Sequence, residues 1–210
     1  DYDAPRGAKT EVALFRIRAS NQRQRIGTLF LNPGGPGGSG VQFAASAEYF
    51  LDPALLERFD VVGFDPRGTN FSDTVRCWPN FAAQGTALEG MMSVPFPNAA
   101  EEFGPYINSA VAFGRACSTT GRPLSQHMST ANVARDMDVL RRTLGDTQLN
   151  YLGFSYGSYL GQVYANLFPD RVRALVIDGV LDPTAWAGTG KTAKTVPQTK
   201  RMKSGEGAAK

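Results

Sequence analysis

Apolar segments of strand length alternate with polar connections in the first third of the chain. Residues 11–18 alternate with a period of two, which is typical of a half-buried strand. A polar turn at 21–25 separates them from a second apolar segment at 26–31, so we expect the two strands to form a hairpin. Residues 60–64 form a short apolar run, which predicts a buried strand closed by a turn at 65–68.

Helical patterns fill the spaces between these strands. Residues 41–51 predict a short helix, and Asp52 as N-cap with Pro53 at the first helical position predicts another that runs to Phe59. Apolar residues at helical spacing predict a helix at 99–117, whereas Phe, Pro, Met and Gly residues around 84–98 indicate an irregular excursion.

The second half of the chain has the clearest periodicity. Ser129 or Thr130 caps a helix whose apolar face recurs every three or four residues and which ends at Gly145. An apolar segment at 149–152, a helical pattern up to Pro169 and a strand at 171–178 follow. Strands alternating with helices predict an α/β fold with a mainly parallel sheet, in one domain over residues 1–187. We expect its last strand to be an uncovered edge.

Charge is distributed unevenly along the 210 residues. The net charge is +3, yet residues 188–210 hold six basic residues and one acidic residue, so the predicted domain is mildly acidic. This distribution does not indicate a nucleic-acid-binding face. No apolar run approaches the roughly 20 residues of a membrane-spanning helix. Because residues 188–210 contain no aromatic residue and few aliphatic ones, we expect them to form a disordered tail.

Cys77 and Cys117 are the two cysteines of the sequence. A disulfide and a pair of buried free thiols are both compatible with their positions. Two thiols and a single histidine do not predict a metal site.

Gly153–Gly157 has the sequence G-x-S-x-G and stands between a predicted strand and a predicted helix. This is the context of a nucleophile elbow, in which Ser155 is raised above the sheet on a strained turn. The flanking positions must be glycine because a Cβ there would collide with the adjoining strand or helix. The N–H of Tyr156 would then point at a developing oxyanion. The alternative is a glycine-rich turn that happens to contain a serine.

Residues 32–40 contain five glycines and directly follow a predicted buried strand. A flexible linker, a phosphate-binding loop and an oxyanion loop are the three interpretations. A P-loop is disfavoured because no Gly-Lys-Ser/Thr follows. An oxyanion loop is favoured, because its free N–H groups must approach a substrate carbonyl and because it predicts the serine elbow downstream.

Several motifs together carry a resemblance to a known family. They are Asn32–Gly40, Val62–Gly68, Ser129–Asp138, Asn150–Gly157, the pairs Tyr164-Ala165 and Phe168-Pro169, and Ile177–Pro183. In this order they resemble the N-terminal part of α/β-hydrolases of the prolyl-aminopeptidase type, above all the secreted tripeptidyl aminopeptidases of actinomycetes.

The resemblance implies a serine peptidase that releases short peptides from free N-termini through an acyl-enzyme. Ser155 would be the nucleophile, and the N–H groups of Tyr156 and Gly35 would form the oxyanion hole. It further implies a peptide substrate, no cofactor, a secreted or cell-envelope location although no signal peptide stands in this chain, and a Cys77–Cys117 disulfide.

The rest of the expected triad is missing from these 210 residues. In this fold the acid and the histidine follow the nucleophile, yet the single histidine, His127, precedes Ser155. We expect His127 to be a polar residue ahead of a helix, and Asp178 is a weak candidate for the acid. The resemblance ends near Gly188, as expected of a truncation or frameshift that leaves the Asp and His beyond codon 187.

A chain without its base is expected to be inactive alone. A catalytically dead binding domain and an esterase of the same fold are the alternatives. The sequence indicates neither the preferred peptide nor the oligomeric state.

Overall fold

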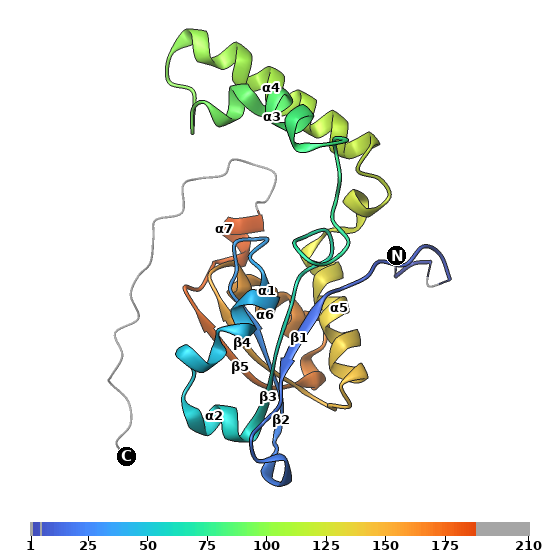
Figure 1. Cartoon of the computed structure of the whole chain (residues 1–210), viewed down its shortest axis with the longest axis vertical. Coiled ribbons are helices and arrows are strands. Elements are labelled where there is room, and N and C mark those ends of the chain that lie inside the picture. The colour runs from blue at the N-terminus through green and yellow to red at the C-terminus, as the bar shows by residue number, and fades with distance from the viewer. Residues whose placement is uncertain (1, 5, 188–210) are drawn as a thin grey trace.

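A five-stranded sheet with helices on both faces forms the body of the protein (Figure 1). The computed structural model describes residues 2–4 and 6–187. The strand order is β1-β3-β2-β4-β5, with β1 antiparallel to β3 and every other pair parallel. The α/β fold with a mainly parallel sheet is thus confirmed. The strands are β1 (Leu14–Ile17), β2 (Gly27–Asn32), β3 (Phe59–Phe64), β4 (Leu149–Phe154) and β5 (Val172–Asp178).

Two apolar layers sandwich the central strands. Every residue of β2 and β3 is buried, as expected of strands covered on both faces. Phe30 and Val62 face α5 (Thr130–Thr143) and α6 (Tyr156–Leu167). Their neighbours Leu29, Leu31 and Val61 face the opposite layer, formed by α1 (Gly40–Ala45), the 3₁₀ helix η2 (Ala47–Tyr49) and α2 (Pro53–Arg58). Alternation along each strand therefore builds two cores from one sheet.

The predicted hairpin between the first two strands is wrong. β3 lies between β1 and β2, and β1 pairs with β3 from Leu14 opposite Phe64 to Ile17 opposite Val61. The connection instead passes through the 3₁₀ helix η1 (Gln22–Gln24) and crosses the start of β3. There the buried carboxylate of Asp60 accepts hydrogen bonds from Arg16, the Ala19 N–H, Gln22 and Arg25. A turn organised by a distant aspartate has no local sequence signal.

The irregular excursion predicted at 84–98 is wrong for residues 84–92, which belong to a helix, whereas residues 93–98 form an irregular connection. α3 (Phe81–Met92) and α4 (Ala100–Thr119) pack side by side and extend away from the sheet (Figure 1). Asn80 caps α3 by accepting from the Ala83 N–H at 2.9 Å. Gly90 fits against the carbonyl of Pro105, and its N–H donates to Ser109 Oγ at 3.1 Å. Packing against α4 supports a helix in which Leu88 is the one buried residue.

The other predicted elements are present with shifted ends. The helix expected at 41–51 is divided into α1 and η2. The Asp52 side chain caps α2 with Pro53 at its first position, and Ser129 caps α5. The helix expected at 99–117 corresponds to α4. The 3₁₀ helices η3 (Leu124–His127) and η4 (Pro169–Arg171) and the short α7 (Pro183–Ala187) complete the described elements.

β5 pairs only with β4, so it is an edge of the sheet that the described residues form. The predicted tail at 188–210 lies outside the described residues. Within the described part of the chain, no helix combines the length and apolar character that a membrane span requires.

Candidate active site

Ser155 occupies the sharp turn between β4 and α6. Its backbone has φ 52° and ψ −121°, in the region that side-chain-bearing residues rarely adopt, and its side chain is exposed. The Ser155 N–H donates to the Asp178 carbonyl at the end of β5 at 2.9 Å, and Ser158 Oγ donates to the Ser155 carbonyl at 2.6 Å. Both backbone polar groups of the serine are therefore satisfied, which holds the hydroxyl above the sheet.

The two glycines of the motif leave no room for a side chain. A Cβ on Gly153 would lie 2.6 Å from the Gly157 carbonyl oxygen, and one on Gly157 would lie 2.8 Å from the carbonyl oxygen of Asn32. The buried Tyr151 hydroxyl donates to the Gly157 carbonyl at 2.8 Å, and burial raises the pKa of this phenol well above its ordinary value. Strand and helix thus approach each other closely around Ser155.

The glycine-rich loop lies directly against this elbow. A Cβ on Gly34 would stand 2.9 Å from the Tyr156 nitrogen and 3.0 Å from the Ser155 Cβ. The Gly34 N–H donates to Asn32 Oδ1 at 2.9 Å, and the Gly38 N–H donates to the Gly34 carbonyl at 3.0 Å. Within residues 2–4 and 6–187, no hydrogen bond engages the N–H of Gly35 or Tyr156. Gly34 therefore brings the glycine-rich loop against the start of α6, and Gly35 is the next residue of that loop.

The turn that follows β3, at residues 65–71, is hydrogen-bonded to the glycine-rich loop and to the start of α1. The sequence analysis did not predict this contact. The buried Asp65 carboxylate accepts from Ser39 Oγ at 2.8 Å, from the Val41 N–H at 3.1 Å and from the Phe71 N–H at 3.0 Å. Asn70 Nδ2 donates to the Gly37 carbonyl at 2.9 Å. Asp65 stands in a motif that carried the family resemblance and Asn70 does not, and no periodic signal marks either residue as a neighbour of the loop.

Comparison with known proteins identifies the family of this chain. The profile described as alpha/beta hydrolase fold matches residues 27–199, well over half of the sequence. The chain belongs to the α/β-hydrolase fold family. The crystal structure of a probable hydrolytic enzyme from Pseudomonas aeruginosa shares the fold, with a TM-score of 0.51 and 14% identity, over 87% of this chain and 41% of that chain.

Named relatives of this chain are similar in sequence. Serine protease Hip1 of Mycobacterium tuberculosis is 41% identical over 186 residues, or 88% of this chain and 35% of the relative. Tripeptidyl aminopeptidase of Streptomyces lividans is 38% identical over 88% of this chain and 34% of the relative. Carboxylesterase B of M. tuberculosis is 40% identical over 87% of this chain and 35% of the relative. The expected resemblance is confirmed, and the chain spans about a third of the length of these relatives.

His127 and Asp178 both make contacts through their backbone carbonyls. The His127 carbonyl accepts from Arg67 Nη1 at 3.2 Å and from Asn132 Nδ2 at 3.0 Å, which fixes the segment ahead of α5. Asp178 contributes its backbone carbonyl to the Ser155 N–H. His127 thus stands just before a helix, as the sequence indicated.

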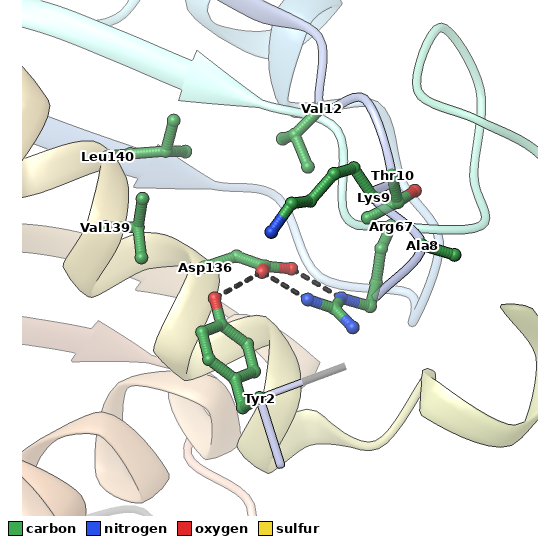
Figure 2. A pocket seen from close by; sticks show the side chains of 9 residues that line it. All are labelled: Tyr2, Ala8, Lys9, Thr10, Val12, Arg67, Asp136, Val139 and Leu140. Atoms are coloured by element: carbon green, nitrogen blue, oxygen red, sulfur yellow. Dashed lines mark hydrogen bonds and ion pairs between the residues drawn. The ribbon is translucent and has the colours of Figure 1, made fainter. Parts of the chain in front are cut away.

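A pocket of about 410 Å³ lies beside the N-terminal segment, with Asp136 at its centre (Figure 2). Arg67 binds the Asp136 carboxylate through two nitrogens, and Tyr2 donates to the same carboxylate at 2.7 Å. Burial and the hydrogen bond to Asp136 raise the pKa of Tyr2, so the phenol stays neutral and donates. Ser155 is not among the residues that line this pocket, and the contacts anchor the N-terminal segment to α5.

Cys77 and Cys117 are joined by a disulfide with a Cα–Cα distance of 4.6 Å. The bond closes the segment that contains α3 and most of α4. It therefore links the segment that precedes α3 to the last turns of α4.

Proposed function

We propose that this hydrolase provides the nucleophile and the oxyanion hole of a serine exopeptidase that releases short peptides from free N-termini. Ser155 attacks the scissile carbonyl and forms an acyl-enzyme, while the N–H groups of Gly35 and Tyr156 stabilise the tetrahedral oxyanion. The observation that carries this proposal is the positive φ of Ser155 at an elbow against which Gly34 packs. No cofactor takes part in this chemistry.

We also propose that the general base and its acid are supplied from outside these 210 residues. The single histidine of the sequence precedes Ser155 and is bound into the start of α5 through its carbonyl. Relatives roughly three times longer have ample chain for both groups. Without a base the serine stays a neutral hydroxyl, so the 210-residue chain alone is expected to be almost inactive.

An exported or cell-envelope location is part of this proposal. The Cys77–Cys117 disulfide supports it, because disulfides persist in oxidising compartments and are rare in the cytosol. A relative named carboxylesterase favours a second candidate, an esterase with the same elbow and oxyanion loop. The two activities share the acyl-enzyme and differ in the leaving group and in the recognition of a free amine.

Labelling with a fluorophosphonate probe tests the nucleophile and the inactivity together. In serine proteases, loss of the base reduces turnover by roughly six orders of magnitude. We therefore expect only trace labelling of the 210-residue chain, absent in Ser155→Ala and present in the exposed-serine control Ser118→Ala. Rapid stoichiometric labelling that Ser155→Ala abolishes would overturn the inactivity, and labelling that survives in Ser155→Ala would overturn the nucleophile.

A substrate panel separates the peptidase from the esterase in a protein that includes the downstream residues. A tripeptidyl anilide with a free N-terminus should be cleaved, and N-acetylation of the same substrate should abolish cleavage. Equal cleavage of both substrates, or cleavage of acyl esters alone, would favour the esterase.

A further inference from the structure

Asn70 has a backbone conformation that is rare for a residue with a side chain. Its φ is 45°, in the left-handed region that asparagine tolerates better than most residues. Among the described non-glycine residues only Ser155 shares a positive φ. Non-glycine residues held in such conformations cluster at functional sites, where the surrounding structure imposes them.

This conformation directs the Asn70 amide at the glycine-rich loop. Nδ2 donates to the Gly37 carbonyl at 2.9 Å, 33 residues away in the sequence. The same turn is fixed at the Phe71 N–H by Asp65, whose carboxylate also binds Ser39 at the far end of the loop. The loop is thereby held at Gly34 by Asn32, at Ser39 by Asp65, and between them by Asn70.

We infer that Asn70 is a positioning residue that holds the Gly34–Gly38 segment in the geometry an oxyanion hole requires. The inference rests on the proposed function for the role of that segment. A loop of four glycines and one proline has little side-chain packing to order it. A hydrogen bond to the carbonyl at its tip therefore restricts the positions that the neighbouring Gly35 N–H can occupy.

Amide hydrogen exchange, measured by NMR on the 210-residue chain, tests whether the Asn70–Gly37 hydrogen bond orders the loop. The measurement does not require catalytic activity. The N–H groups of Gly34 and Gly38 are hydrogen-bonded inside the loop and report its opening. Asn70→Gly keeps the positive φ, and Asn70→Asp keeps the size, but neither can donate to Gly37. We expect exchange at Gly34 and Gly38 to rise about fivefold in both variants, the factor given by one hydrogen bond of about 1 kcal/mol.

Asn98→Asp is the matched control, because Asn98 also donates its side-chain amide to a backbone carbonyl, that of Phe96 in the α3–α4 connection. This control should leave Gly34 and Gly38 unchanged. Unchanged exchange in the Asn70 variants would overturn the inference. So would a uniform rise that includes the amides of β4, because that result would indicate global destabilisation.

Phosphonylation of Ser155 separates this inference from the proposed function. In a protein that reacts, Asn70→Gly should slow labelling about fivefold at an unchanged melting temperature, and an unchanged rate would overturn the positioning role. If the unsubstituted protein with its downstream residues fails to react at all, the proposed function fails, and the exchange result still decides whether Asn70 orders the loop.

Discussion

Ser155 and the glycines around it are constrained by the space between β4, α6 and the glycine-rich loop. Gly157 lies against the Asn32 carbonyl, and Gly34 lies against the elbow itself. These glycines are required by close approach of backbone to backbone, which no side-chain rearrangement can relieve. By contrast, a Cβ on Gly114 in the exposed part of α4 would meet no atom within 4 Å.

Alanine substitutions at Gly157 and Gly114 should have opposite effects on the free energy of unfolding. Gly157→Ala forces α6 away from β2 and should lower the free energy of unfolding by about 1–3 kcal/mol. Gly114→Ala should raise it by about 0.5–1 kcal/mol, because glycine disfavours a helix interior. Urea unfolding followed by circular dichroism measures both. Equal effects of the two substitutions would contradict the close packing at the elbow.

Asp138 joins three elements of the sheet's α5–α6 face. Its buried carboxylate accepts hydrogen bonds from Arg141 on the same helix, from Tyr164 on α6 and from Arg171 at the end of η4. Burial alone would raise the pKa of Asp138, but the hydrogen bonds from Arg141 and Tyr164 and the two arginine charges lower it overall. The ionised carboxylate is therefore the form that the folded protein favours.

A lowered pKa makes this cluster sensitive to acid. Its contribution to stability is complete above the ordinary aspartate pKa of about 3.9 and is lost as the pH falls through the lower pKa of the folded state. Asp138→Asn should reduce the free energy of unfolding at pH 7 by about 3–5 kcal/mol, because Arg141, Arg142 and Arg171 all lose their carboxylate partner. Urea unfolding at a series of pH values should show a shallower loss below pH 4 in this variant.

Asp170→Asn is the control for this measurement, since Asp170 is exposed on η4 and its side chain takes no part in the cluster. It should retain the acid sensitivity of the original chain. An Asp138→Asn variant with undiminished acid sensitivity would show that other carboxylates are responsible.

The described sheet has an exposed edge at β5. Val176 on this strand is 59% exposed, and the backbone groups that face away from β4 have no strand partner among the described residues. Such an edge can pair with another chain. A second exposed apolar surface is present on α4, where Val111 is 63% exposed.

Self-association of the 210-residue chain should therefore depend on β5. Sedimentation equilibrium should detect concentration-dependent association, and Val176→Lys should weaken it several-fold because lysines on paired edges repel each other. Val111→Lys places the same charge on α4 and should leave association unchanged. If Val111→Lys weakened self-association and Val176→Lys did not, the contact between chains would lie on α3 and α4 instead of β5.

Local patterns were sufficient for the α/β alternation, the helix caps and the serine elbow. The caps Asp52 and Ser129 bind residues only two or three positions away, and the G-x-S-x-G motif is a single turn. A short stretch of sequence is therefore sufficient to predict them. The glycine-rich loop was identified in the same way, because its composition excludes both helix and strand. Family resemblance, not spacing, suggested Gly35 as a donor and Cys77 with Cys117 as a pair.

Contacts between distant segments decided the rest. β1 pairs with β3 because Asp60 gathers the connection across the start of that strand, and α3 is helical because α4 packs against it. Arg67 meets Asp136 across 69 residues, and Asn70 reaches Gly37 across 33. These partners are brought together by the packing of the sheet and its two helical layers. No short segment of the sequence determines that packing.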